Sequence, residues 1–149
     1  TYYMKIHELG HIVLYVSNLE RSAYFYKTVL GFREIHRNLH IALFSSGRTH
    51  HELLLIEVGG GPVVKNSYPK AGLYHVGFKI GNTDDELKDA IKELAEKGVR
   101  IVGLADHHVT HSLYILDPDN NELELYIDVD DSWKNNPSKI LAPTKRLTL

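Results

Sequence analysis

The chain has 149 residues, a formal net charge of −2 at pH 7 and no cysteine. This length fits one domain, or two small halves that share a core, and the composition is ordinary for a soluble globular protein. The near-neutral charge, without a basic cluster, argues against a nucleic acid or a membrane surface as a partner. The lack of cysteine excludes disulfides, thiolate metal ligands and a cysteine nucleophile, and it fits a cytoplasmic location.

The start of the chain shows no secretory or transit signature. No apolar run approaches the roughly 20 residues that a membrane-spanning helix needs. Because the first residue is threonine, we expect that the initiator methionine has been removed or that a few residues have been added. Ten histidines are the unusual feature of the composition, and most of them are expected to be surface or core residues without a catalytic role.

The first half of the sequence predicts a helix and four strands. Residues 11–16 are apolar after the first, as expected of a strand that is covered on both faces. A helix is expected from Leu19, because Asn18 supplies a capping side chain and Gly31 supplies the left-handed residue that ends a helix. The remaining strands are predicted at Phe32–His36, Ile41–Ser45 and His51–Val58. The predicted order is βαβββ.

The second half repeats this order after a glycine-rich break. Residues 59–72, which begin Gly-Gly-Gly-Pro, are predicted to be a linker. A capping box, Thr83 to Glu86, begins the second helix, and Gly98 ends it. The strands are predicted at His75–Ile80, Val99–Leu104, Ser112–Leu116 and Glu122–Asp128. The polar residues 129–149 are expected to form a C-terminal arm over the body of the protein or over a second subunit.

Matching positions in the two halves indicate an internal duplication. His11 and His75 are 64 residues apart, and so are Asn18 and Asn82. We therefore predict an α+β fold in which two tandem βαβββ modules form one curved mixed β-sheet cleft, with the helices outside. The predicted boundaries are 7–58 and 73–128 for the modules and 7–128 for the single domain.

Alternation along the predicted strands places histidines and carboxylates on one face. The apolar residues of each strand are needed on the face that the helices cover, so His11 and His75 point the other way. In the last strand the same rule places Glu122, Glu124 and Tyr126 on the open face. Two imidazoles and a carboxylate with open positions are the ligands of non-haem Fe(II) oxygenases, and they also suit catalytic zinc. A lone histidine that begins a strand is more often structural, so the assignment depends on the duplicated pair.

The first half also resembles a known family. Gly10-His11, Asn18 to Ser22 and Phe25 to Phe32 are typical of the first module of the vicinal-oxygen-chelate superfamily. That group includes glyoxalase I, extradiol ring-cleaving dioxygenases, fosfomycin-resistance transferases and bleomycin-binding proteins. The resemblance covers roughly residues 9–128.

The later sequence resembles the extradiol dioxygenase signature in particular. The positions that match it in spacing are His107, Leu113-Tyr114, Asp117-Pro118 and Glu124. Two positions depart from the signature, because Asn120 replaces the usual glycine and Ala105 stands two residues before the histidine. Asparagine is the next-best residue for a left-handed conformation. The likeness is strongest to small catechol 2,3-dioxygenase-like proteins.

This resemblance implies an Fe(II) extradiol-type dioxygenase with a defined set of site residues. The implied metal ligands are His11, His75 and Glu124, with Mn(II), Ni(II) and Zn(II) as alternatives to Fe(II). The implied catalytic residues are Tyr114, which would bond to a substrate oxygen, His51 as acid and base, and His107 beside them. His50 is the alternative to His51, because the register of this segment is open by one residue. The implied partners are O₂, a small catechol-like substrate and a second copy of the chain in a homodimer.

Two other functions remain open. A glyoxalase I-like lyase or isomerase would need a fourth ligand, and Glu57 stands 18 residues before His75, at the spacing of bacterial glyoxalase I. Its parity matches His51, Leu53 and Leu55, which would allow it to face the cleft, although a solvated carboxylate is also expected beside Gly59. The third possibility is a metal-free binding protein like those that sequester bleomycin.

Overall fold

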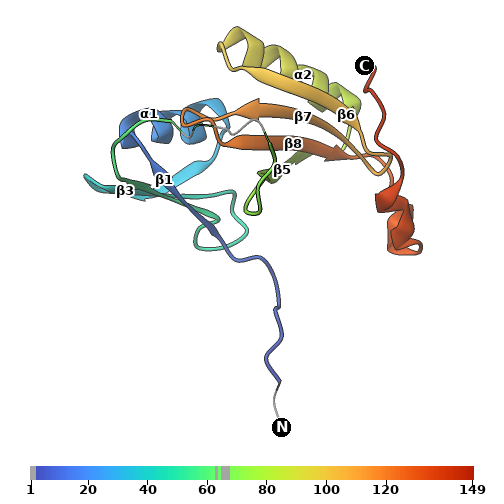
Figure 1. Ribbon diagram of the computed structural model, residues 1–149, viewed down its shortest axis with the longest axis horizontal. Helices are drawn as coiled ribbons and strands as arrows, with labels where there is room; N and C mark the ends of the chain where they lie inside the picture. Colours follow the sequence, from blue (N-terminus) through green and yellow to red (C-terminus); the bar gives the residue numbers. More distant parts are fainter. Residues whose placement is uncertain (1–2, 63, 65–67) are drawn as a thin grey trace. The chain divides into compact units, whose positions relative to one another are not determined.

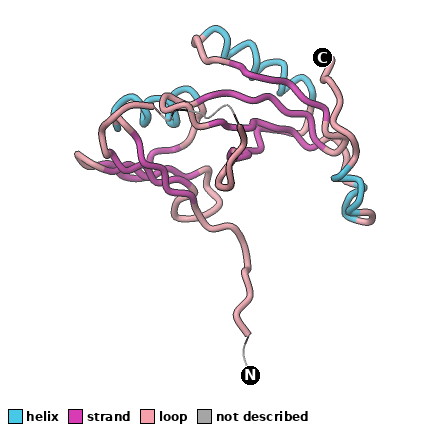
Figure 2. Tube along the Cα trace, in the orientation of Figure 1, coloured by secondary structure: helices cyan, strands magenta, loops and turns pink. Residues whose placement is uncertain are grey.

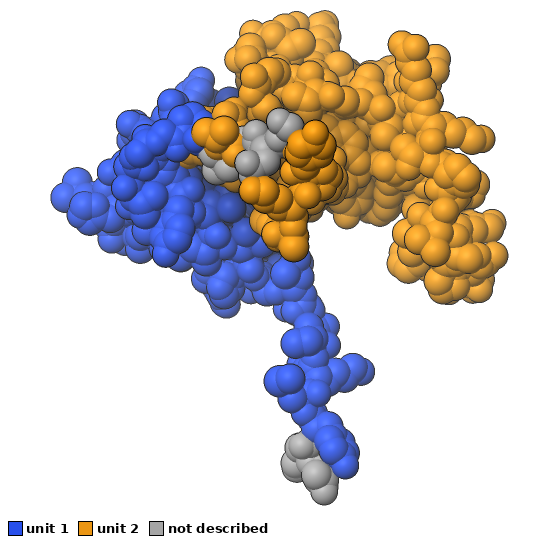
Figure 3. Space-filling view, in the orientation of Figure 1, with its two compact units in different colours: residues 1–62 blue, residues 63–149 orange. Residues whose placement is uncertain are grey.

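The structure is a computed structural model that describes residues 3–62, 64 and 68–149. It divides into two compact units, residues 1–62 and 63–149 (Figure 3). Each unit contains a four-stranded mixed sheet, so the predicted tandem βαβββ fold is confirmed (Figures 1 and 2). The single domain 7–128 and the shared cleft stay predictions, and residues 63 and 65–67 of the predicted linker lie outside the described residues. Among the described residues, no helix has the length and apolar character to cross a bilayer.

Unit 1 has the predicted element order. Its elements are β1 (Ile12–Val16), α1 (Leu19–Tyr24), the π-helix η1 (Phe25–Val29), β2 (Arg33–Arg37), β3 (Ile41–Ser45) and β4 (Leu53–Glu57). The strands lie in the order β1-β4-β3-β2, with β1 parallel to β4 and the other pairs antiparallel. The helix that was predicted as one element changes to π geometry, where Leu30 N donates to the Phe25 carbonyl five residues earlier. Asn18 caps the start of α1, and Gly31 follows its end with φ of 83°.

Unit 2 repeats the order and carries the longer helix. Its elements are β5 (His75–Gly81), α2 (Asp84–Glu96), β6 (Ile101–Asp106), β7 (Thr110–Leu116) and β8 (Glu122–Asp128). The strands lie in the order β5-β8-β7-β6, and α2 covers one face of the sheet (Figure 1). The predicted capping box is confirmed, because Glu86 N donates to Thr83 Oγ1 at 3.2 Å and Thr83 Oγ1 donates to Glu86 Oε1 at 3.0 Å.

The core of each unit lies between its sheet and its helix. In unit 2, alternate residues of β7 and β8 are fully buried beneath α2: Leu113, Ile115, Leu123, Leu125 and Ile127. In unit 1 the corresponding residues of β3 and β4 are Ala42, Phe44, Leu53 and Leu55. Because strand side chains alternate, the residues between these positions lie on the opposite face of each sheet. The polar side chains of the candidate functional site lie on that face.

The C-terminal arm lies on unit 2. It contains two 3₁₀ turns, η2 (Ser132–Lys134) and η3 (Pro137–Leu141), and then a backbone bridge between Asp106 and Lys145. The bridge consists of two hydrogen bonds, of 2.9 and 2.8 Å. Leu147 beyond it is buried. The arm is therefore fixed to the end of β6 within its own unit.

Several predicted strand boundaries were wrong by one to three residues. β4 begins at Leu53 rather than His51, because the Glu52 side chain bonds back to Ser46 and closes a loop. β6 spans Ile101–Asp106 rather than Val99–Leu104, and β7 begins at Thr110 rather than Ser112. The correction at β4 matters for function, because it moves His51 from a strand to a loop.

Candidate functional site

His75 and Glu124 lie next to each other on the open face of unit 2. His75 begins β5, and Glu124 lies on the neighbouring parallel strand β8, opposite Gly77. Nε2 of His75 is 3.1 Å from Oε2 of Glu124. Gly77 has no side chain, and a Cβ there would lie 3.7 Å from Oε2 of Glu124 and 3.5 Å from the ring of Tyr126. His75 and Glu124, two of the three predicted ligands, thus lie side by side within unit 2, and their role as ligands stays a prediction.

The second oxygen of Glu124 is held by two hydroxyl groups from β7. Ser112 Oγ donates to Glu124 Oε1 at 2.6 Å, and Tyr114 Oη donates to the same oxygen at 3.2 Å. Both donors lie on the open face, and Tyr114 stands directly opposite Glu124 in the strand register. Oε2 is thereby left facing His75. Ser112 was missed in the sequence, although its position two residues before Tyr114 places it on the same face.

A chain of side chains leads from Glu124 through Tyr114 to the C-terminal arm. Nε2 of His107 is 2.7 Å from the Tyr114 hydroxyl, and Nδ1 of His107 is 3.0 Å from Oγ1 of Thr144. Burial and the negative charge of Glu124 raise the pKa of Tyr114 well above its usual value. Tyr114 therefore keeps its proton at neutral pH and is a hydrogen-bond donor there.

The other side of His75 faces a second carboxylate. Nδ1 of His75 is buried, makes no hydrogen bond to the described residues and lies 3.5 Å from Oε2 of Glu122. The charge of Glu122 also raises the pKa of Tyr74. A histidine that binds a metal through one nitrogen commonly directs the other toward a carboxylate, and Glu122 is the carboxylate on this side of His75, without a hydrogen bond between the two atoms. The sequence placed Glu122 on the open face beside Glu124, but it did not distinguish a metal ligand from a carboxylate that only lies next to His75.

The geometry around His75 and Glu124 fits two ligands of one metal ion. Ligand atoms at right angles, with bonds of about 2.1 Å, lie about 3 Å apart. The 3.1 Å between Nε2 and Oε2 matches this separation. Among the described residues, however, no group of three histidine, aspartate or glutamate side chains has a metal-binding arrangement. The structure thus brings two of the three predicted ligands together in unit 2, and metal binding by them stays a prediction.

The third predicted ligand lies in unit 1 beside the predicted acid and base. The rings of His11 and His51 have their centroids 4.6 Å apart, and Nδ1 of His51 is 2.6 Å from Nδ1 of His50. Burial, together with the positive charges that His11 and His50 can carry, lowers the pKa of His51. Of His50 and His51, His51 is the residue whose ring contacts the ring of His11. Because its pKa is lowered, His51 is neutral near pH 7.

Arg48 and Glu52 fix the loop that carries His50 and His51. The Arg48 guanidinium donates to the carbonyl oxygens of Leu9 and Gly10 at 3.1 and 2.8 Å, directly before His11. Glu52 accepts from the backbone and side chain of Ser46 at 3.0 and 2.7 Å. The loop and the residue before β1 are thus joined by one side chain. This role of Arg48 was not predicted from the sequence.

The prediction that Glu57 could face the open side of the sheet was wrong. Its Oε2 accepts a hydrogen bond from Leu19 N at 2.7 Å, at the N-terminus of α1. β4 directs Leu53, Leu55 and Glu57 toward the helix, and a carboxylate there is stabilised by the free amides of the first turn. Glu57 therefore has a structural partner on the helix side.

Comparisons with known proteins agree with this architecture. Residues 8–125 match the family model of the "Glyoxalase/Bleomycin resistance protein/Dioxygenase superfamily". The chain is 36% identical over 127 residues to a catechol-2,3-dioxygenase of Bacillus subtilis, covering 83% of this chain and 43% of that protein. It is 32% identical over 120 residues to biphenyl-2,3-diol 1,2-dioxygenase 3 of Rhodococcus globerulus, covering 80% and 63%. This chain thus spans less than two thirds of either relative.

A solved structure shows the same fold. A glyoxalase/dioxygenase from Nostoc punctiforme aligns with a TM-score of 0.67 and 22% identity, over 83% of this chain and 92% of that one. The tandem modules, the alternation on their strands and the match over residues 8–125 lead to one assignment. The chain belongs to the glyoxalase/bleomycin resistance protein/dioxygenase superfamily.

Proposed function

We propose that this protein is a metal-dependent oxidoreductase, an Fe(II) extradiol-type dioxygenase that opens the ring of a small catechol-like substrate. The proposed metal ligands are His11 from unit 1 and His75 and Glu124 from unit 2. The proposed catalytic residues are Tyr114, His107 and His51. Fe(II) is the proposed metal, and Mn(II), Ni(II) and Zn(II) are the alternatives.

The observation that carries this proposal is the chain of contacts from His107 through Tyr114 to Glu124. It places a protonated phenol and an imidazole directly beside a carboxylate that pairs with His75. A phenol and an imidazole are the groups needed to hold a substrate oxygen and to move its proton. The names of two relatives, a catechol-2,3-dioxygenase and a biphenyl-2,3-diol 1,2-dioxygenase, point to the same chemistry.

Each residue has a separate task in this reaction. When bound, Fe(II) would supply neighbouring positions for the two oxygens of a catechol and for O₂. Tyr114 keeps its proton and donates to a substrate oxygen, and His107 orients the phenol. His51, neutral near pH 7, accepts a proton from a catechol hydroxyl. One carbon–carbon bond beside the diol breaks, and both atoms of O₂ enter the product, so no further reductant is needed.

The glyoxalase-like alternative has less support. It needs a fourth protein ligand, and Glu57 bonds instead to the N-terminus of α1. A metal-free binding protein has no need of the arrangement around Glu124, in which three side chains from two strands orient one carboxylate. Measurements of oxygen uptake with catechol and of hemithioacetal turnover distinguish both alternatives from the dioxygenase.

The proposal is tested by loading the protein with Fe(II) without air, adding catechol and then admitting air. We expect oxygen uptake together with the coloured ring-opened aldehyde. Turnover of the hemithioacetal of glutathione and methylglyoxal with Ni²⁺ or Zn²⁺, without oxygen uptake from any simple catechol, would overturn the proposal in favour of the lyase. Binding of catechol without either reaction and without stoichiometric metal binding would overturn the proposal in favour of the metal-free binding protein.

The ligands are tested separately by metal binding. His11→Ala, His75→Ala and Glu124→Gln should each abolish stoichiometric Fe(II) binding, whereas His40→Ala, which changes an exposed histidine, should leave it unchanged. Wild-type affinity in His11→Ala would exclude unit 1 from the site, and wild-type affinity in His75→Ala would refute the assignment as a whole. The homodimer, the cytoplasmic location and a role in the breakdown of aromatic compounds remain part of this proposal.

A further inference from the structure

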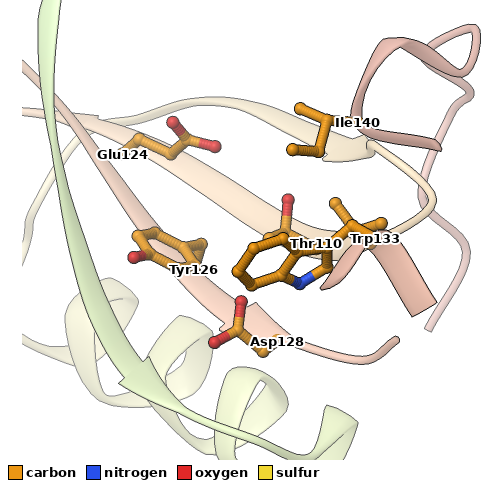
Figure 4. A pocket seen from close by; sticks show the side chains of 7 residues that line it. Thr110, Glu124, Tyr126, Asp128, Trp133 and Ile140 are labelled. Atoms are coloured by element: carbon orange, nitrogen blue, oxygen red, sulfur yellow. The ribbon is translucent and has the colours of Figure 1, made fainter. Parts of the chain in front are cut away.

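A pocket of about 300 Å³ opens beside Glu124 on unit 2 (Figure 4). Glu124 and Tyr126 form one side of it from β8, and Trp133 and Ile140 of the arm lie across from them. Val109, at the turn before β7, completes the apolar lining. The volume exceeds the roughly 150 Å³ of a protein cavity that can hold benzene. The pocket is thus large enough for a ring or an alkyl group and adjoins a proposed metal ligand.

The arm that forms the far wall is anchored on both sides of the pocket. Before Trp133, Ser132 N donates to Asp130 Oδ1 at 2.6 Å, and Val129 N donates to the carbonyl oxygen of Val109 at 3.0 Å. After Ile140, the backbone bridge to Lys145 joins the arm to β6. The wall is therefore in place without a ligand, which lowers the entropic cost of binding.

The charges around the pocket favour an uncharged ligand. The one carboxylate at its outer end, Asp128, is paired with Lys79 at 2.9 Å. Burial, together with the charge of Asp128, raises the pKa of Tyr126, so the phenol of Tyr126 is uncharged at neutral pH. An anionic group placed here would meet Asp128 and lose its hydration without gaining a free cation. Flat faces of Tyr126 and Trp133 suit an aromatic or alkyl group instead.

We propose that the C-terminal arm forms a subsite for an uncharged, apolar substituent on the substrate ring, with Trp133 and Ile140 as its specificity-determining residues. The match to the family model ends at residue 125, so both residues lie outside the matched segment. The proposal rests on the proposed function in one respect, because it takes the substrate to be a substituted catechol whose diol lies toward Glu124.

Trp133 is the only tryptophan of the chain, so its fluorescence reports on the surroundings of this one side chain, which also borders a second pocket with Lys79 and Asp131. The probes are 2-phenylphenol, phenol and 2-hydroxybenzoate, which have no adjacent diol and cannot undergo ring opening. We expect 2-phenylphenol to change the emission in a saturable way and to bind at least about tenfold more tightly than phenol or 2-hydroxybenzoate. Equal affinities for the three probes, or no saturable change, would overturn the proposal.

Two neighbouring variants separate the wall from the rest of the arm. Ile140→Ala should weaken 2-phenylphenol binding about fivefold and leave phenol binding unchanged, with Ile140→Val intermediate. Leu141→Ala is the matched control, because Leu141 is 84% exposed and does not line the pocket. Equal weakening by the two alanine variants would refute the role of Ile140. Far-UV circular dichroism and the urea midpoint verify that each variant is folded.

Activity measurements distinguish failure of this proposal from failure of the proposed function. If the protein opens catechols, Ile140→Ala should lower kcat/KM for 3-phenylcatechol about fivefold relative to catechol. An unchanged ratio would refute the subsite and leave the dioxygenase in place. If no catechol is opened but the fluorescence titrations give the expected order, the arm subsite is supported and the dioxygenase is refuted.

Discussion

The Tyr114 hydroxyl lies 2.7 Å from Nε2 of His107, and the same hydroxyl donates to Glu124 at 3.2 Å. One phenol therefore joins an imidazole to the carboxylate that faces His75. An ionised Glu124 carboxylate can only accept hydrogen bonds. The phenol therefore donates its proton either to Glu124 or to a substrate oxygen that replaces Glu124 as its partner. In the proposed function, Tyr114 would therefore connect the orientation of the proposed metal ligand with the recognition of substrate.

We predict that Tyr114→Phe lowers both metal affinity and activity. Loss of the hydroxyl leaves Glu124 Oε1 with Ser112 as its donor, and it removes the partner of His107. We expect Fe(II) affinity to fall about tenfold and kcat/KM for catechol to fall about a hundredfold or more. Isothermal titration of the metal and oxygen uptake measure these effects. Tyr24→Phe, at an exposed residue of α1, is the control; equal kinetics in both variants would contradict the role of Tyr114.

We predict that Thr144 acts as a positioning residue through His107. Its Oγ1 is 3.0 Å from Nδ1 of His107, so the arm limits the rotation of the imidazole. Thr144→Val keeps the shape and removes the oxygen, and we expect kcat to fall about tenfold with little change in KM. Thr144→Ser restores the oxygen and should recover most of this loss. Thr148→Val, at an exposed position of the same arm, should have no effect. Failure of serine to rescue would indicate a packing role alone.

The elements that the sequence predicted correctly are those specified by local patterns. β3 and β8 have the predicted bounds because alternating side chains and adjacent turns define them. Asn120 adopts the predicted left-handed conformation, with φ of 65°, so it can replace the glycine of the extradiol signature. The pairing of Glu124 with His75 followed from parity once the duplication was recognised.

The features that the sequence did not predict depend on contacts between distant residues. Glu57 turns toward α1 because the free amide of Leu19 is nearby, whereas its parity with His51 allowed it to face the cleft. The anchoring of the arm uses backbone atoms of Asp106 and Lys145, which carry no signal in their side chains. The role of Trp133 in the predicted arm 129–149 was not predicted either, because its neighbours on the pocket come from β7 and β8.

Arg48 should affect metal binding without contacting the metal. Its guanidinium holds the carbonyl oxygens of Leu9 and Gly10, so it fixes the backbone before His11. Lysine keeps the charge but lacks the planar fork that reaches both oxygens. We expect Arg48→Lys to lower Fe(II) affinity about tenfold while costing about 1 kcal/mol of stability. Arg33→Lys, at an exposed position of β2, is the matched control. Unchanged metal affinity in Arg48→Lys would remove this link between the loop and His11.

Glu52 should make the protein less stable in acid. Burial acts to raise its pKa, but hydrogen bonds from Ser46, Ser45 and Arg48 outweigh it and lower the pKa to about 2, from an ordinary value of 4.5. The ionised carboxylate therefore stabilises the folded state above pH 4.5, and this contribution is lost as the pH falls from 4.5 to 2.

We expect Glu52→Gln to lose about 1 to 2 kcal/mol at pH 7, because the pairing with Arg48 is partly screened by solvent. The same variant should lose less stability than the wild type between pH 4.5 and 2.5, since it has no proton to bind there. Urea unfolding at pH 7, 4.5 and 3 measures both effects. Glu96→Gln, at an exposed residue of α2, controls for the change in net charge. Parallel pH profiles for Glu52→Gln and the wild type would mean that the loop does not depend on this carboxylate, and the acid sensitivity would then have to come from other groups.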